Sequence, residues 1–98
     1  MVSTLSATVP AIRDNVERSR FELEVQGMLV FANYRRQGSV LFIDWVEAAR
    51  PLRGTGAAGR SMQGIAELAR REGWTITPFC GYAAAWLRQN KGARGLLT

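Results

Sequence analysis

The chain has 98 residues, of which 47% are hydrophobic, and this is enough for one small domain with a single core. Thirteen basic residues, all but one of them arginine, outweigh eight acidic ones and give a net charge of +5. This charge favours anionic partners such as nucleic acid, acidic lipid or a phosphorylated cofactor, although solubility alone would also account for it. No apolar run approaches the roughly 20 residues of a membrane span, and the first residues lack the regions of a signal peptide, so we expect a cytoplasmic protein.

The residues that the sequence lacks restrict its chemistry. There is no histidine, so the side chain best suited to acid–base catalysis near pH 7 is missing. Cys80 is the one cysteine, which excludes an intrachain disulfide. Any catalysis must therefore use carboxylates, Cys80, tyrosines, water or backbone groups, and we predict no metal site.

Three strands are predicted in the first half of the chain, after a Ser/Thr-rich segment, residues 1–10, that we expect to be loose. Residues 20–27 alternate between apolar and polar side chains, with Glu22 on the polar face, which is typical of a half-buried strand. Residues 28–36 and 40–49 are largely apolar on both faces, which suits strands nearer the middle of a sheet. Short Gln-Gly turns join the three strands, so an antiparallel meander is predicted.

Two helices separated by a short strand are predicted in the second half. An apolar stripe at helical spacing runs from Ala58 to Ala69. Residues 74–77 predict a fourth strand, residues 81–90 predict a shorter helix, and residues 91–98 are expected to form a loose tail.

The predicted order is β-β-β-α-β-α, which indicates an α+β (mixed α/β) fold formed by a single domain over residues 1–98. The third and fourth strands, joined by a helical crossover, are predicted to be parallel, so the four-stranded sheet is mixed and carries two helices. A ligand site is expected at the carboxyl ends of these two strands.

The segment "RGTGAAGR", Arg53 to Arg60, lies between the third predicted strand and the first predicted helix. Its small residues leave the unpaired N–H groups at the helix start accessible, and these groups form a cradle for phosphate at the positive end of the helix dipole. The alternative is a packing loop, in which the glycines bring helix and sheet close together. A Walker loop is excluded, because no lysine followed by Ser or Thr stands at the required spacing.

The segment Arg53-Gly54-Thr55-Gly56-Ala57-Ala58 matches the signature (Q/R)-x-x-G-x-(G/A), and Pro78-Phe79-Cys80-Gly81-Tyr82 follows the fourth predicted strand. With "RFELEVQGMLVFANYR", these segments make residues 14–90 resemble the GNAT superfamily of acetyltransferases, and in particular its small single-domain, YjdJ-like class. The resemblance implies a GNAT-like fold, acetyl-CoA as the cofactor and an unidentified amine as the acetyl acceptor.

The same resemblance implies that backbone amides of the loop hold the CoA pyrophosphate, and that the pantetheine arm lies where the third and fourth strands diverge. The implied cofactor-binding residues are Ala48, Ala49, Arg53, Gly54, Thr55, Gly56, Ala57, Ala58 and Gly59.

Three residues are candidates for the chemistry of acetyl transfer. Cys80 precedes a helix, where a thiolate is stabilised, and would either carry the acetyl group or fill space as a small buried side chain. Tyr82 would protonate the leaving thiolate or pack beneath the second helix. Glu47 would act as a base, directly or through water, or be a solvated charge at a strand end.

Trp45 marks a departure from the family pattern, because small members of the superfamily commonly have histidine eight residues before the loop arginine. The alternative function is therefore a CoA-binding or interaction module with weak or no turnover. A nucleic-acid-binding domain is a third possibility, disfavoured because the arginines are scattered and not interleaved with aromatic residues. Asp44, within an apolar strand, is expected to pair with an arginine or to shape the acceptor site.

Overall fold

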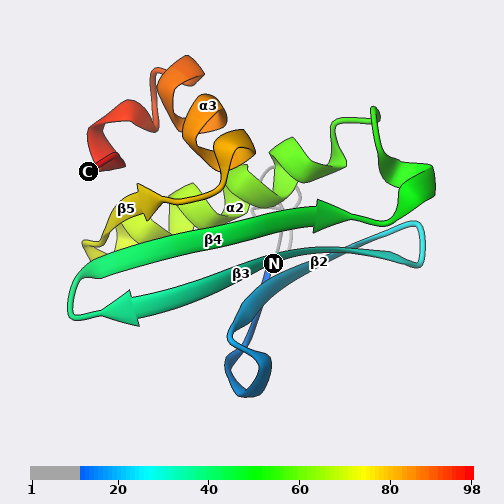
Figure 1. The fold of residues 1–98 in the computed structure, drawn as a ribbon, viewed down its shortest axis with the longest axis horizontal. Coiled ribbons are helices and arrows are strands. Elements are labelled where there is room, and N and C mark those ends of the chain that lie inside the picture. Colours follow the sequence, from blue (N-terminus) through cyan, green and yellow to red (C-terminus); the bar gives the residue numbers. More distant parts are fainter. Residues whose placement is uncertain (1–11) are drawn as a thin grey trace, which may run out of the picture.

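The computed structural model describes residues 12–98, and this range contains five strands and two α-helices (Figure 1). The predicted N-terminal tail, residues 1–10, lies outside the described residues. The elements in chain order are β1 (Arg13–Asn15), the 3-10 helix η1 (Val16–Arg18), β2 (Arg20–Val25), β3 (Met28–Gln37), β4 (Val40–Ala48), the 3-10 helix η2 (Arg50–Leu52), α2 (Ala57–Glu72), β5 (Thr75–Pro78), α3 (Gly81–Gln89) and the 3-10 helix η3 (Arg94–Leu96).

The strands form one sheet in the order β1-β2-β3-β4-β5. Neighbours among β1 to β4 are antiparallel, whereas β4 and β5 are parallel, because α2 carries the chain back along the sheet before β5 begins. The predicted α+β fold, with a mixed sheet and two α-helices, is confirmed. The predicted number of four strands is one too low, since β1 adds a fifth at the edge of the sheet.

The sequence does not reveal β1, because three residues are too few to show an alternating pattern. β1 is attached to the sheet by polar contacts with Glu22 of β2. Arg13 Nη2 donates to Glu22 Oε1, Arg20 Nε donates to Glu22 Oε2 at 2.7 Å, and Asn15 Nδ2 donates to the same oxygen at 3.0 Å. These bonds lower the pKa of Glu22 to about 2. The Glu22 side chain is 5% exposed, so the prediction of a solvent-facing position is wrong: its partners cover it.

The core lies between the sheet and α2, with α3 packed beside α2 and β5 (Figure 1). Buried side chains recur every second residue along the strands and every three or four residues along α2, so each element supplies one apolar face. The largest fully buried side chains are Leu41, Ile43, Met62, Ile65, Ile76, Leu87 and Val30.

Residues 91–98 are packed against the domain, contrary to the prediction of a loose tail. Ala93 is buried, and Leu97 forms an isolated parallel bridge with Ile76 of β5. Thr98 N donates to Ile76 O at 2.9 Å. β5 is the last strand of the sheet, so one of its edges has no neighbouring strand. The contacts of Leu97 and Thr98 satisfy backbone groups on that edge.

Candidate functional site

β4 and β5 separate at the point where the candidate site begins. Four residue pairs join the two strands, and the last is Ile43 with Pro78. Phe79 N then donates to Ile43 O at 2.8 Å, and the chain turns into α3 while β4 continues to Ala48. Within the described residues, the last part of β4 therefore has a neighbouring strand on one side only.

A bulge at Asp44 sets which way the last residues of β4 face. Ile43 and Trp45 pair with adjacent residues of β3, so Asp44 is the extra residue between them. The extra residue resets the alternation, and Val46 packs towards the same core as Ile43 although the two are three residues apart. Trp45 and Glu47 consequently share the opposite, exposed face, where their side chains are hydrogen-bonded.

Asp44 pairs with an arginine, which is one of its two predicted roles. Arg35 Nε and Nη2 donate to the two carboxylate oxygens at 2.9 and 2.8 Å. These hydrogen bonds lower the pKa of the Asp44 carboxyl below its ordinary value. The Arg35 guanidinium also lies over the rings of Phe42 and Phe79, at 4.9 and 5.4 Å from their centres. The Arg35 guanidinium, fixed by these contacts, thus balances the negative charge of Asp44.

The free edge of β4 presents the backbone groups of Val46 and Ala48. Ala49 N donates to Leu29 O of β3 at 3.0 Å, so the backbone of Ala49 faces β3. Backbone groups of successive strand residues face opposite sides, and those of Val46 and Ala48 therefore face the gap left by β5. Ala48 O accepts a hydrogen bond there from Arg53 Nε at 3.2 Å.

The loop after η2 brings the N-terminus of α2 to this gap. Gly54 and Gly56 have φ angles of 81° and 88°, which lie in the left-handed region that residues with a side chain rarely adopt. Gly56 is the residue before α2, and it has no side chain with which to cap the helix. The two glycines therefore allow a tight entry that leaves the helix start uncovered.

Several backbone amides at this helix start have no partner among the residues that the structure describes. Ala57 N donates to Thr55 Oγ1 at 3.3 Å. Within residues 12–98, four nearby amides donate to no acceptor, namely those of Gly54, Gly56, Ala58 and Gly59. Unpaired N–H groups at the positive end of a helix dipole form a binding site for an anion.

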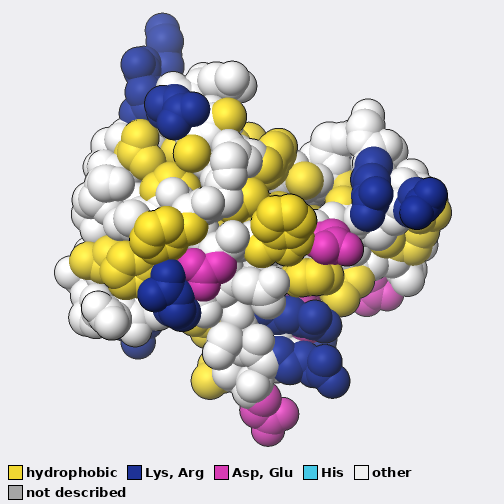
Figure 2. Space-filling view, viewed as in Figure 1, with side chains coloured by type: hydrophobic (Ala, Val, Ile, Leu, Met, Phe, Trp, Pro, Cys, Tyr) yellow, Lys and Arg dark blue, Asp and Glu magenta, His cyan; other side chains and the backbone are white. Residues whose placement is uncertain are grey.

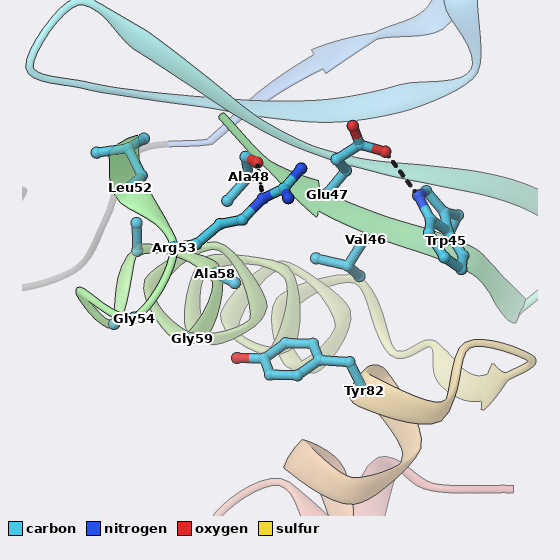
Figure 3. Close-up of a pocket in the computed structure, with 12 residues that line it drawn as sticks. Trp45, Val46, Glu47, Ala48, Leu52, Arg53, Gly54, Ala58, Gly59 and Tyr82 are labelled. Carbon is cyan, nitrogen blue, oxygen red and sulfur yellow. Dashed lines mark hydrogen bonds between the residues drawn. The ribbon is translucent and has the colours of Figure 1, made fainter. Parts of the chain in front are cut away.

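A cavity of about 640 Å³ lies between the β4 edge and the glycine loop. Figure 2 shows it as a hollow between the main body and the lobe that contains η2 and the loop, with apolar side chains along it. Figure 3 shows the β4 side chains on one side of it and the ring of Tyr82 on the other. The lining residues are Trp45, Val46, Glu47, Ala48, Leu52, Arg53, Gly54, Gly56, Ala57, Ala58, Gly59 and Tyr82.

Most of the residues predicted from the sequence meet in this cavity. Those that line it are Glu47, Ala48, Arg53, Gly54, Gly56, Ala57, Ala58, Gly59 and Tyr82. Three predicted residues, Ala49, Thr55 and Cys80, do not line it. The backbone of Ala49 faces β3 instead. The Thr55 hydroxyl accepts a hydrogen bond from the Ala57 amide and so stabilises the loop.

Sequence reasoning missed Val46 and Leu52 as lining residues. Leu52 is a buried residue of η2, and nothing in its local sequence distinguishes it from a core leucine. Strand alternation could have predicted that Val46 faces the cavity, but the bulge at Asp44 interrupts the alternation just before it.

Cys80 and Tyr82 begin α3 but have different surroundings. Cys80 is 6% exposed and belongs to the main core cluster. Tyr82 is 43% exposed, and its hydroxyl lies near Gly59, where a β-carbon added to the glycine would be 3.5 Å from that oxygen (Figure 3). Partial burial, and secondly the Cys80 thiol, raise the pKa of Tyr82 above its ordinary value. The phenol therefore keeps its proton at neutral pH.

Trp45 and Glu47 form a pair at the β4 side of the cavity. Trp45 Nε1 donates to Glu47 Oε1 at 2.9 Å, and both side chains are exposed (Figure 3). The bond fixes the indole beside the carboxylate, so the two present one surface to the cavity.

Two further properties concern the described residues as a whole. Among residues 12–98, no group of three His, Cys, Asp or Glu side chains is arranged to hold a metal ion. No helix in this range is long and apolar enough to cross a membrane.

Comparison with known proteins assigns the family. The sequence matches the GCN5-related N-acetyl-transferase family over residues 20–95, a range that includes β2 to β5, both α-helices and every residue that lines the cavity. A search of curated proteins found no match. Because the family match covers well over half of the 98 residues, the chain belongs to the GCN5-related N-acetyltransferase family.

Proposed function

We propose that this protein binds acetyl-CoA in the cavity between β4 and α2 and transfers the acetyl group to an amine. The observation that carries the proposal is that, within residues 12–98, one cavity joins helix-start amides that have no acceptor to a strand edge that has no neighbouring strand. Acetyl-CoA needs both, since it has a pyrophosphate at one end of an amide-containing arm. When bound, it would supply the acetyl group as a reactive thioester.

The glycine loop has the chemistry to hold the pyrophosphate. The amides of Gly56, Ala58 and Gly59 are at the positive end of α2, and no capping side chain competes for them. A β-carbon built on Gly54 or Gly56 meets nothing within 4 Å, so the space next to the backbone is open. An anion can thus approach the loop amides directly.

The strand edge has the chemistry to hold the arm. Val46 and Ala48 face the gap left by β5, and an extended ligand with amide groups would pair with them as a strand would. Small or apolar side chains line this part of the cavity, which leaves room for a backbone-like ligand.

We assign the proton transfers to two side chains that line the cavity. The amine nitrogen would bond to the acetyl carbon and lose one proton, keeping an N–H in the amide product, while the carbon–sulfur bond breaks and the sulfur gains one proton. Glu47 would accept the proton from the amine and pass it to water, and Tyr82, protonated at neutral pH, would donate one to the departing sulfur and regain it from water. Cys80 is buried in the core, which supports a packing role for it.

A thermal melt with and without acetyl-CoA tests the cofactor site. Ligand at about 100 times its dissociation constant adds roughly 2.7 kcal/mol, which in a domain of this size raises Tm by about 10–20 °C. We expect this shift with acetyl-CoA and with CoA, and none with adenine. No shift at millimolar ligand would make the glycine segment a packing loop and would favour a nucleic-acid or interaction role.

A pair of variants at Gly56 tests the phosphate cradle. Asn and Asp tolerate left-handed backbone better than other side chains, so Gly56→Asn and Gly56→Asp carry a similar strain and differ by one charge. We expect Gly56→Asp to bind CoA roughly tenfold more weakly than Gly56→Asn, or worse, because a carboxylate would stand beside the phosphates. Equal affinities in calorimetric titration would place the phosphates elsewhere.

A further inference from the structure

A small cluster of side chains lies outside the cavity, at the point where β4 and β5 separate. It consists of Arg35 from β3, Phe42 and Asp44 from β4, and Phe79 from the turn after β5, and we call it the Arg35 cluster. The two phenyl rings are stacked with their centres 5.9 Å apart, and the guanidinium lies over both. None of these four residues lines the cavity. Any effect of the cluster on the site therefore passes through the strands that it joins.

On the β4 side, the Arg35 cluster holds the bulge. The residues on either side of Asp44 pair with adjacent residues of β3, so the sheet register gives Asp44 itself no partner. Arg35 supplies the missing contact through two hydrogen bonds, one to each oxygen, which fix both the position and the orientation of the carboxylate. The place of the bulge decides that the backbone of Val46 faces the free edge of β4, because a shift by one residue would reverse that position.

On the β5 side, the cluster holds the turn into α3. Ile43 O accepts hydrogen bonds from Phe79 N at 2.8 Å and from Cys80 N at 3.3 Å, and among the described residues these are the last backbone bonds between β4 and the chain that follows β5. The Phe79 residue is 63% exposed, and its ring packs on Phe42 and under the guanidinium of Arg35. One guanidinium therefore links the bulge in β4 to the first residue after β5.

We propose that Arg35 is a positioning residue for the cofactor cavity, which holds the Asp44 bulge and the Phe79 turn together and so sets the width of the gap between β4 and β5. This assignment rests on the proposed binding of acetyl-CoA, whose arm would lie in that gap. A planar guanidinium pairs with a carboxylate and stacks on aromatic rings at the same time, which an ammonium group does not. A gap of fixed width reduces the entropy that is lost when the arm binds.

Calorimetric titration of acetyl-CoA into Arg35→Gln, Asp44→Asn and the double variant tests this role. We expect each single variant to bind acetyl-CoA roughly tenfold more weakly than wild type, because the strand edge is no longer held in one arrangement. The double variant should bind no more weakly than either single one, because both changes remove the same contact. All three should remain folded during the titration, which a melt checks, since exposed ion pairs contribute little to stability.

The sign of the Asp44→Asn effect separates positioning from long-range charge. Acetyl-CoA is an anion, so removal of a cation weakens its attraction to the protein and removal of a carboxylate strengthens it. A role through charge alone would therefore make Asp44→Asn bind more tightly than wild type, whereas positioning makes it bind more weakly.

Arg36→Gln is the matched control, because it removes the same charge from the next residue of β3. The Arg36 guanidinium lies over the ring of Trp74 and donates to Gly38 O, at the hairpin between β3 and β4 and not at the bulge. We expect this variant to bind acetyl-CoA within about twofold of wild type, since solvent and salt screen an exposed charge.

Three results would overturn the positioning role: wild-type affinity in Arg35→Gln, an equal loss of affinity in Arg36→Gln, or tighter binding by Asp44→Asn. If wild type binds acetyl-CoA and one of these results is found, the cofactor site stands and only the role of Arg35 is wrong. If acetyl-CoA does not bind to wild type, the proposed function is wrong and the positioning role is overturned with it.

Discussion

At the scale of single residues, the site depends on which of two neighbouring side chains reaches the cavity. Cys80 ends the turn after β5 and is enclosed by the core, whereas Tyr82, two residues later, extends from α3 towards Gly59. A thiol in such packing acts as a small apolar side chain. The phenol has access to the cavity, and its raised pKa keeps it protonated at neutral pH, which the proposed role as proton donor requires.

We therefore expect Tyr82→Phe to reduce the rate of acetyl transfer much more than Cys80→Ala does. Thiol release from acetyl-CoA with n-butylamine should fall about 100-fold in Tyr82→Phe, as for loss of a general acid, and only a few-fold in Cys80→Ala. Acetyl-CoA should still raise the Tm of both. A hydroxylamine-sensitive acetyl adduct on wild-type protein that is missing from Cys80→Ala would show instead that Cys80 is a nucleophile.

At the scale of elements, two edge features shape the sheet. The bulge at Asp44 turns Trp45 and Glu47 to one face of β4 and leaves the backbone of Val46 and Ala48 at the free edge. β1 is attached to β2 through polar bonds that converge on Glu22, since a three-residue strand buries little apolar surface. The attachment of β1 should therefore depend on the charge of that carboxyl.

The folded protein should lose stability in acid partly through Glu22. Its pKa in the folded protein is about 2, against an ordinary value of 4.5, so its contribution is complete above pH 4.5 and disappears as the pH falls towards 2. Urea unfolding of wild type and Glu22→Gln should give a stability difference that shrinks across this window. Glu24→Gln, on the same strand, is the control, and an identical pH dependence for both variants would contradict the prediction.

At the scale of the whole molecule, the two ends of the described chain lie at opposite edges of one sheet. β1 extends it beside β2, and residues 91–98 cover β5 through the bridge of Leu97 with Ile76 and the bonds of Thr98. The β4–β5 separation that forms the cavity depends on β5 staying paired as far as Ile43. The C-terminal residues therefore support the site indirectly.

Removing residues 94–98 should destabilise the domain by about 2 kcal/mol, because partly buried leucines and the bonds to β5 are lost. Tm should fall by roughly 8–16 °C for this loss in a domain of this size. Lys91→Ala, an exposed change in the same segment, should leave Tm unchanged. An unchanged Tm after the deletion would restore the interpretation of this segment as a loose tail.

The sequence by itself determined the features that depend on neighbouring residues. Alternation identified β2, apolar runs between turn residues identified β3 and β4, and helical spacing identified α2, since burial leaves a local pattern in each case. Glycines before α2 identified the loop, because Gly54 and Gly56 adopt backbone angles that other residues avoid. The match of this loop and of the segment around Cys80 to a family signature indicated acetyl transfer before any geometry was available.

The tertiary structure alone decided which of the candidate residues meet. Burial of Glu22 and attachment of β1 depend on polar side chains that converge only when β1 pairs with β2, and packing of residues 91–98 depends on β5, about 20 residues earlier; neither leaves a local period. The bulge at Asp44 placed Val46 at the cavity and turned Ala49 away, because one extra residue in a strand reverses every position that follows.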